Sequence, residues 1–242
     1  MQRIFKGLLI GLFLLSTYSC TKTDNQPGPN AGFQGRLLDV TNGKNNFSTE
    51  TGGVQIKLEE LSWSETPTPQ YIPSKPDGTF EDTKLFSGHY RVTPVNGAFW
   101  PVDPVELDIN GLTTHDFELT PYLKITNFSH RLSGDTLIME FKLAAPVTEG
   151  LPTIIDAQPF VNITPYVGAG ATISQYTNPP DQSKPNKIDI NSNWDDSIAQ
   201  KTYVMKVPDL KHGRTFYARV GVRVNDSYKQ FNYSDVVEVQ VP

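Results

Sequence analysis

The chain of 242 residues has 21 lysines and arginines against 26 aspartates and glutamates, a formal net charge of −5. This mildly acidic balance disfavours nucleic acid and anionic lipid headgroups as partners, because both are negatively charged. Eighteen glycines and nineteen prolines are spread along the chain, which favours many short strands joined by turns. The length suits one large domain or two ordinary ones.

The first nineteen residues are predicted to be a signal peptide. Arg3 and Lys6 supply positive charge, an apolar run follows over residues 8–15, and Ser19 stands directly before Cys20. The run is too short to span a bilayer, which takes about 20 apolar residues. A small residue before a cysteine at this place resembles a lipobox, which implies cleavage after residue 19 and acylation of Cys20. An ordinary secretory peptide that happens to end in cysteine is the alternative.

Cys20 is the only cysteine in the sequence, so the chain forms no internal disulfide and has no cysteine cluster for a metal. A free thiol would be a liability in an oxidising compartment, and acylation removes it. Residues 20–30 are polar and interrupted by proline and glycine, so we expect them to form a flexible tether. The sequence therefore predicts a protein attached to a membrane by a lipid rather than inserted through the membrane.

Residues 31–120 are predicted to form an antiparallel β-sandwich. Every second residue is apolar in several stretches, which is typical of half-buried strands. These stretches contain Val54, Ile56 and Leu58, then Tyr90 and Val92, then Val105, Leu107 and Ile109, with turn sequences at Asp77-Gly78 and Asn110-Gly111.

Four short motifs of this first unit resemble, in the same order, the transthyretin-like, carboxypeptidase-regulatory-like sandwich. They are Gly35-x-Leu37-x-Asp39, Gly53-Val54-x-Ile56-x-Leu58-x-Glu60, Asp77-Gly78-Thr79-Phe80 and Phe86-x-Gly88-x-Tyr90-x-Val92. The resemblance implies a spacer or interaction domain rather than a catalyst.

Residues 121–242 are predicted to form a second antiparallel sandwich. Apolar residues alternate from Leu137 to Leu143, from Tyr203 to Val207, from Phe216 to Val224 and from Val237 to Val241. The last two stretches, with Leu210-x-x-Gly213 before them, resemble the final strands of a fibronectin type III-like, Ig-like sandwich. The predicted fold is thus all-β, with two antiparallel β-sandwiches in tandem behind the tether.

No motif predicts catalysis, a cofactor or a metal. The four histidines lie far apart, and a strand turns Glu59 and Glu60 to opposite faces. The sequence has neither a nucleophile elbow nor a zinc-protease motif. Asp195 and Asp196 could bind calcium from a loop, although a solvated turn explains them as well. We therefore expect a protein that is not an enzyme.

Aromatic residues in loops are the candidate ligand-binding residues. Trp63 follows a predicted strand with Tyr71 nearby, and Trp194 stands between Asn193 and Asp195, with Tyr176 in an earlier loop. Flat aromatic rings can stack on sugar rings while neighbouring amides and carboxylates bind hydroxyls. The alternative is that each ring caps the end of its own sandwich.

Two tripeptides, Asp135-Thr136-Leu137 and Asp196-Ser197-Ile198, resemble the acceptor motif for O-glycosylation in Bacteroidetes. The resemblance implies that the hydroxyls of Thr136 and Ser197 carry glycans.

The mature chain as a whole resembles a two-domain family of Bacteroidetes lipoproteins, usually encoded beside SusC/SusD-type glycan uptake systems. Phe86-x-Gly88-x-Tyr90, Thr120-Pro121-Tyr122 and Phe231-Asn232-Tyr233-Ser234 carry this resemblance. It implies a lipid-anchored protein of the outer membrane, at the cell surface, with SusC/SusD-type proteins as partners. The predicted function is non-catalytic binding of oligosaccharide by loop aromatics, as an accessory to glycan uptake. A spacer or protein-interaction module of an envelope complex is the alternative.

Overall fold

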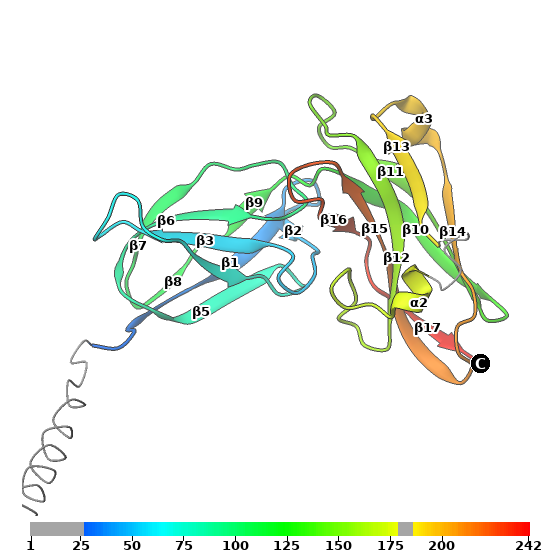
Figure 1. The fold of residues 1–242 in the computed structure, drawn as a ribbon, viewed down its shortest axis with the longest axis horizontal. Helices are drawn as coiled ribbons and strands as arrows, with labels where there is room; N and C mark the ends of the chain where they lie inside the picture. Colours follow the sequence, from blue (N-terminus) through cyan, green and yellow to red (C-terminus); the bar gives the residue numbers. More distant parts are fainter. Residues whose placement is uncertain (1–26, 179–185) are drawn as a thin grey trace, which may run out of the picture.

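The computed structural model describes residues 27–178 and 186–242. Figure 1 shows two β-sandwiches joined end to end, with the first described residues at the end of the first sandwich far from the second. Nearly all regular structure in these ranges is strand, so the predicted all-β class is confirmed. No helix in the described ranges has the length and apolar character needed to cross a bilayer. Cys20 lies outside the described residues.

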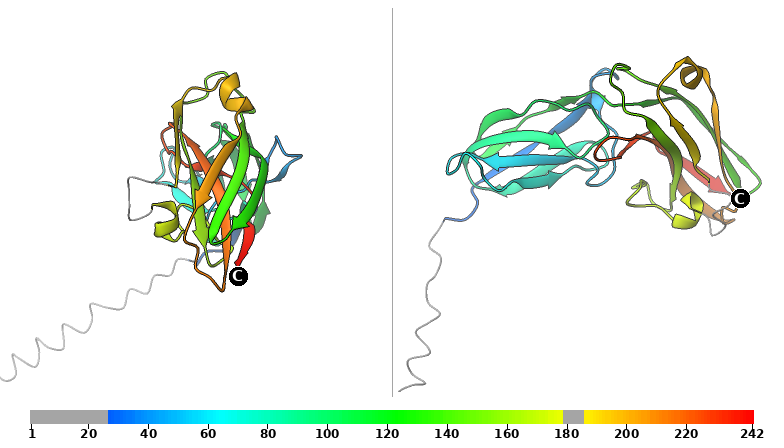
Figure 2. Two further views of the ribbon diagram at one scale, coloured as in Figure 1. Left: turned by 90° about the vertical axis from the view of Figure 1, so that its right-hand side faces the viewer. Right: turned by 45° about the horizontal axis from the view of Figure 1, so that its top comes forward.

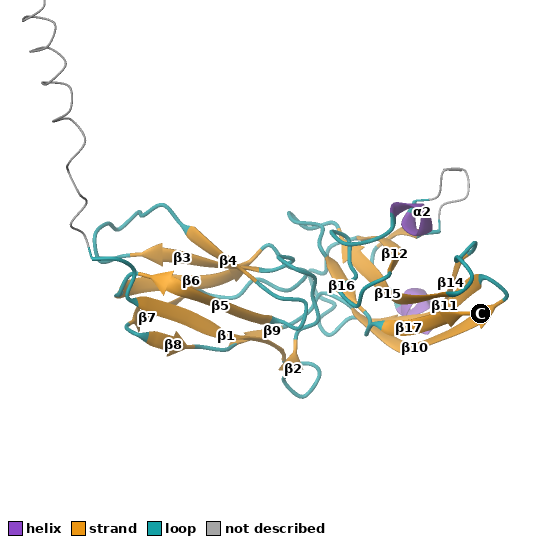
Figure 3. Cartoon of the chain, turned by 90° about the horizontal axis from the view of Figure 1, so that it is seen from below, coloured by secondary structure: helices purple, strands orange, loops and turns teal. Residues whose placement is uncertain are grey.

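The first sandwich packs two sheets face to face, as Figure 3 shows from below. Its strands are β1 (Ala31–Asp39), β2 (Asn45–Asn46), β3 (Gln55–Glu60), β4 (Gln70–Pro73), β5 (Thr79–Leu85), β6 (Gly88–Val95), β7 (Val105–Ile109), β8 (Leu112–Thr114) and β9 (Phe117–Leu119). One sheet has the antiparallel order β4-β3-β6-β7. The other is built around β1, which pairs antiparallel with β2 and β5 and parallel with β8 and β9. These two parallel pairs add to the antiparallel arrangement expected from the sequence.

The core of the first sandwich combines aromatic and aliphatic side chains. Phe80 lies between Phe33 and Phe117, with ring centroids 5.4 and 6.0 Å away. Ile56 and Leu58 of β3 face them and are fully buried, as their alternation predicted. Burying one such side chain stabilises the fold by roughly 1.5–3 kcal/mol, so this core holds the two sheets together.

The second sandwich also packs two sheets. Its elements are β10 (Lys124–Ser133), β11 (Thr136–Ala144), β12 (Ile154–Asn162), α2 (Ser174–Thr177), β13 (Ile188–Ser192), α3 (Asp196–Gln200), β14 (Tyr203–Val207), β15 (Arg214–Val224), β16 (Phe231–Tyr233) and β17 (Val237–Val241). One sheet has the order β10-β11-β14, and the other has the order β13-β12-β15-β16, with β17 also paired to β15. The two layers are visible edge-on in the left view of Figure 2.

Polar contacts fix the two sandwiches to each other. Glu50 of the first sandwich accepts hydrogen bonds from the Tyr233 hydroxyl at 2.9 Å and from the Gly170 backbone N–H at 2.6 Å. Arg219 of β15 donates from Nη1 to the carbonyl oxygen of Thr49 at 2.9 Å, and its guanidinium lies 3.6 Å from the Tyr233 ring centroid. Burial lowers the pKa of Arg219, an effect that Tyr233 and Glu50 oppose.

Asn232 completes the junction. Its side-chain oxygen accepts a hydrogen bond from the Leu123 backbone N–H at 3.0 Å, and its amide nitrogen donates to the carbonyl of Ala98 at 2.7 Å. The adjacent residues Phe99 and Trp100 then enter different cores, the first sandwich's and the second's respectively. The interface between the two sandwiches is therefore restrained both by the backbone that connects them and by the hydrogen bonds of Asn232.

Candidate ligand-binding surface

Tyr71 lies on the edge strand of the sheet β4-β3-β6-β7, and Trp63 lies in the loop that joins β3 to this strand. Trp63 is 88% exposed in the loop that follows β3, and Tyr71 of β4 is 48% exposed. Tyr71 is opposite Lys57 of β3. Because Ile72 of the same strand is buried, strand alternation turns the neighbouring Tyr71 to the outer face of the sheet.

The outer face of this sheet is polar across its central strands. Its residues on β3, β6 and β7 are Lys57, Glu59, His89, Arg91, Thr93, Glu106 and Asp108. The register places Lys57 between Tyr71 and Thr93. It also places Arg91 between Glu59 and Glu106. Tyr71 is therefore the aromatic edge of a continuous polar surface.

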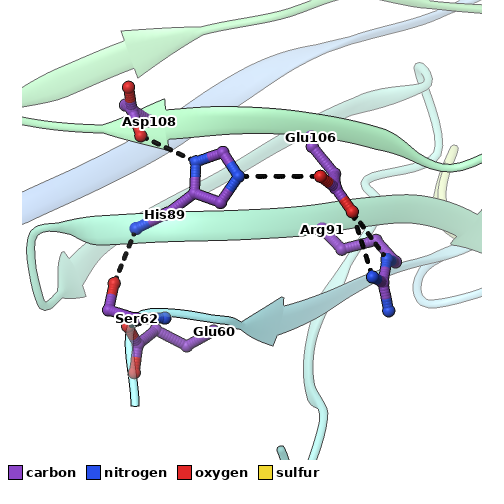
Figure 4. A network of polar contacts seen from close by, with 6 residues as sticks. All are labelled: Glu60, Ser62, His89, Arg91, Glu106 and Asp108. Atoms are coloured by element: carbon purple, nitrogen blue, oxygen red, sulfur yellow. Dashed lines mark hydrogen bonds and ion pairs between the residues drawn. The ribbon is translucent and has the colours of Figure 1, made fainter. Parts of the chain in front are cut away.

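Charged side chains of this surface hold one another in place (Figure 4). Arg91 donates from Nε and Nη2 to Oε1 of Glu106, at 3.1 and 3.0 Å. His89 lies 2.8 Å from Asp108 through Nδ1, and its Nε2 is 3.7 Å from Oε2 of Glu106. On the inner strand β3, the Lys57 ammonium is 2.9 Å from the carboxylate of Glu59. Pairs of this kind contribute little to stability at a surface, but they restrict the positions of the donors and acceptors.

His89 is the titratable member of this network. Its hydrogen bond to Asp108, followed by the charges of Asp108 and Glu106, raises the pKa of the imidazole above its ordinary value. Its backbone N–H donates to the Ser62 hydroxyl at 2.9 Å, which ties the β3–β4 loop to β6. The loop that carries Trp63 is thus attached to the polar surface through its neighbour Ser62.

This arrangement suits a neutral, hydroxyl-rich ligand better than an ion. Cations and anions alternate on the surface, so neither sign of charge dominates. A sugar presents an apolar ring face to an aromatic side chain and hydroxyls to carboxylates and guanidinium groups, both of which are present here. Within the two described ranges, no three His, Cys, Asp or Glu residues are placed to hold a metal ion.

The predicted aromatic residues of the second sandwich have structural roles. Tyr176 of α2 is only 4% exposed and packs edge-on against Phe216, with ring centroids 5.6 Å apart. The prediction that its ring faces a ligand is therefore wrong, because the ring fills the core. Trp194 is partly buried and packs on the same core. Both residues follow the alternative interpretation, in which an aromatic ring caps its own sandwich.

Asn193 and Asp195, also predicted to bind the ligand, both accept hydrogen bonds from the second sandwich itself. Asn193 accepts a hydrogen bond from the Thr153 hydroxyl at 2.7 Å. Asp195 caps α3, where its carboxylate accepts from the Ser197 hydroxyl at 2.6 Å and from the Ile198 backbone N–H at 3.0 Å. The hydrogen bond from Ser197 is the main cause that lowers the pKa of Asp195.

The two predicted glycosylation sites differ in accessibility. Ser197 is exposed on the first turn of α3, whereas Thr136 is half-buried at the start of β11 and donates to Asp135 at 3.3 Å. Their use as acceptors stays a prediction.

The sequence analysis missed the polar surface and the junction because both depend on strand register. His89 and Arg91 alternate with buried residues on β6, as Glu106 and Asp108 do on β7. Reading these two strands as one antiparallel pair would have placed cations opposite carboxylates. The contacts of Glu50 with Gly170 and Tyr233 join residues more than 100 positions apart, and no local pattern indicates them.

Two family models match the chain. The one described as "Protein of unknown function (DUF3823) N-terminal domain" matches residues 31–120, and "Domain of unknown function (DUF3823_C)" matches residues 123–238. A comparison with curated proteins gives no match.

Solved structures with the same fold include proteins of Bacteroides and Parabacteroides species. A DUF3823 family protein from Bacteroides uniformis is 21% identical with a TM-score of 0.75, and one from Parabacteroides merdae is 21% identical with a TM-score of 0.65. A further Bacteroides uniformis protein, described as a "putative carbohydrate binding protein", is 20% identical with a TM-score of 0.70. Each alignment covers 88% of this chain and 100% of the other. At this identity the likeness shows the fold, while the transthyretin-like and fibronectin-like subtypes stay predictions.

Proposed function

The chain belongs to the two-domain DUF3823 family, and from that premise we propose that it is an accessory glycan-binding protein. In this proposal a lipid on Cys20 holds it at the outer membrane, beside a SusC/SusD-type importer. The observation that carries the glycan proposal is the exposed ring of Tyr71 at the edge of the polar surface of β3, β6 and β7. A structural relative described as a "putative carbohydrate binding protein" adds support.

The ligand is placed on the first sandwich, beside Tyr71. A sugar ring stacks on the phenol, and its hydroxyls bond to Lys57 and Thr93 on the neighbouring strands. Trp194 is not part of this surface, because it packs on the core of the other sandwich. Trp63 lies beyond the end of β3, outside the rows of residues that form the surface.

Affinity electrophoresis of the protein in gels containing soluble polysaccharides tests this function. With a glycan that retards the wild type, Tyr71→Ala should weaken binding about two- to twelve-fold, since an aromatic stacking contact is worth roughly 0.5–1.5 kcal/mol. Tyr228→Ala removes a similarly exposed tyrosine of the second sandwich and is the matched control. If Tyr71→Ala and the wild type migrate equally in every glycan that retards the wild type, Tyr71 is not part of the binding site. If no glycan retards the wild type, the protein does not bind glycans.

A second candidate function, a spacer or protein-interaction module, is favoured by a groove in the second sandwich. The groove is open and about 860 Å³ in volume, and its apolar lining includes Ile188 of β13 and Val204 of β14. Among the described strands, β14 pairs on one side only, with β11. A partner's extended segment could add to this edge. Co-purification from native membranes distinguishes the two functions: Val204→Asp would release a partner held here and leave glycan binding unchanged.

A further inference from the structure

Three large apolar side chains are exposed together at one end of the first sandwich. Trp63 lies in the β3–β4 loop, Phe86 in the turn between β5 and β6, and Leu112 at the start of β8. They are 88%, 52% and 60% exposed. We call these three residues the apolar tip. Solvent exposure of single apolar residues is common, but a group of this size at one end of a domain calls for a partner.

Backbone contacts place the apolar tip around the point where the chain enters the fold. Leu112 is paired with Gly32 of β1. The Asn30 N–H donates to the carbonyl of Leu85, directly before Phe86, at 3.0 Å. Ser62, directly before Trp63, accepts a hydrogen bond from the first residues of β6. Figure 2 shows this end of the sandwich, where the blue chain enters, opposite the second sandwich.

The presentation of the apolar tip is fixed by the fold. The Tyr90 hydroxyl donates to the carbonyl of Phe86 at 2.9 Å. The side-chain oxygen of Asn30 accepts from both the N–H and the hydroxyl of Ser87, at 2.9 and 3.0 Å. The turn that carries Phe86 is therefore tied to the incoming chain and to the core, so its side chain can be buried by a partner with little loss of backbone entropy.

We infer that the apolar tip inserts into the interface of the lipid bilayer that holds the protein. This inference rests on the lipid anchor of the proposed function. Asn30 is ten residues after Cys20, so the two are at most about 35 Å apart, and a flexible linker of that length would have a root-mean-square span of about 18 Å. The tether therefore confines the apolar tip close to the bilayer and raises its effective concentration there.

The chemistry of the tip fits a lipid interface. Tryptophan is enriched at the boundary between headgroups and hydrocarbon, where its amphipathic ring is favoured, and Phe86 and Leu112 add purely apolar area. Exposed charges near this end have mixed sign, with Lys84 on β5, Glu65 in the Trp63 loop and Asp108 on β7. Apolar insertion, rather than attraction to anionic headgroups, drives the contact, so zwitterionic lipid suffices and added salt has little effect.

Quenching by brominated lipid tests the contact. The acylated full-length protein is purified from native membranes and reconstituted into vesicles of phosphatidylcholine with and without bromine on the acyl chains. Part of the tryptophan emission should be lost in the brominated vesicles. Trp63→Phe should abolish that loss, whereas Trp194→Phe, which alters a tryptophan packed on the second core, should leave it unchanged.

A second variant keeps Trp63 as the reporter and removes the apolar area around it. Phe86→Asp with Leu112→Asp should reduce the quenching of Trp63, while Ile163→Asp, at an exposed site of the second sandwich, should not. Acylated protein whose Trp63 emission is the same in both vesicles overturns the inference. If Trp63 is unquenched by lipid but shielded from iodide in native envelopes, a protein partner covers the tip and the lipid assignment is wrong.

The lipid anchor on Cys20 and the lipid contact of the apolar tip are tested separately. An unacylated Cys20, found by mass spectrometry, removes the membrane anchor of the proposed function and with it the basis of this inference. An acylated Cys20 with no lipid contact by Trp63 removes the inference alone. Tyr71→Ala should leave the quenching unchanged and weaken only the glycan contact.

Discussion

Tyr233 of the second sandwich donates its hydroxyl to Glu50 of the first, with 2.9 Å between the two oxygens. Burial, and next the negative charge of Glu50, raise the pKa of this phenol well above its ordinary value. The phenol therefore stays protonated and remains a donor at every physiological pH.

Tyr233→Phe should lower the free energy of unfolding by about 1.5–3 kcal/mol, since a hydrogen bond to a charged acceptor is lost in a buried place. Glu50 keeps its bond from Gly170, which limits the loss. Urea denaturation measures the change. Tyr217→Phe on β15 is the control, because no hydrogen bond of the Tyr217 hydroxyl is found within the described ranges. Equal losses in the two variants would show that the Glu50 contact contributes nothing specific.

Gly168→Ala should destabilise the junction, whereas Gly170→Ala should be tolerated. A Cβ atom at residue 168 would lie 2.7 Å from Arg219 Nη2 and 2.8 Å from Oε2 of Glu50. At residue 170 the nearest atom, again Oε2 of Glu50, is 3.4 Å away. Overpacking of this kind costs about 1–3 kcal/mol. Thermal unfolding of both variants checks the difference, and an unchanged midpoint for Gly168→Ala would contradict the close packing.

Asp195→Ala should reduce stability without changing glycan binding, because the carboxylate caps α3. Loss of an N-cap should lower the Tm by about 2–4 °C. The lowered pKa of Asp195 gives the pH dependence: its contribution is present above the unfolded-state pKa of about 3.9 and is lost as pH falls through the folded-state value. Asp196→Ala is the matched control. A loss of glycan retardation in Asp195→Ala at full stability would return this residue to the ligand site.

His89 should titrate at a higher pH than an unperturbed histidine. Its raised pKa means that the folded state favours the protonated imidazole. The stabilisation is therefore complete below the unfolded-state pKa of about 6.5 and is lost as pH rises through the folded-state value. NMR titration of the imidazole measures this shift. Asp108→Asn should bring the midpoint back toward 6.5, and an unchanged midpoint in that variant would exclude Asp108 as the main cause.

The alternation of apolar and polar residues predicted the strands that bury one face and expose the other. β11, β15 and β17 were predicted because apolar residues line one face of each, and their inward residues are buried. β10 gave no such signal, since most of its residues are partly exposed and its register with β11 shifts between Thr126 and Ser129. A strand that buries little on either face leaves no periodic pattern in the sequence.

Two short helices of the second sandwich gave no signal in the sequence. α2 and α3 have four and five residues, too few for a helical period to appear. The residues around Trp194 were therefore read as a loop, although Asp195 is a helix cap. Tyr71 was named from the sequence only as a neighbour of Trp63 in a loop, whereas it lies on β4 and is 48% exposed. Its polar neighbours on β3 and β6 could not be predicted, because they depend on the strand register, which the composition of the sequence does not reveal.

The segment Phe231-Asn232-Tyr233-Ser234 makes hydrogen bonds that connect the two sandwiches and stabilise the second. Asn232 and Tyr233 bond across the junction, while Ser234 accepts a hydrogen bond from the Val220 N–H at 3.0 Å within the second sandwich. The sequence analysis used this motif only as a sign of relatedness. Its residues hold the two sandwiches in one orientation.

The position of β1 determines how the protein withstands a pull on its N-terminus. β1 has β5 on one side and β8 and β9 on the other, and it begins at the end where the chain enters. Tension applied through Asn30 acts along the strand, roughly perpendicular to the hydrogen bonds of both ladders. Many of these bonds must then shear together, rather than open one after another as in a peeled edge strand. The pairing of β1 on both sides would therefore resist a pull on its N-terminus better than a single edge ladder would.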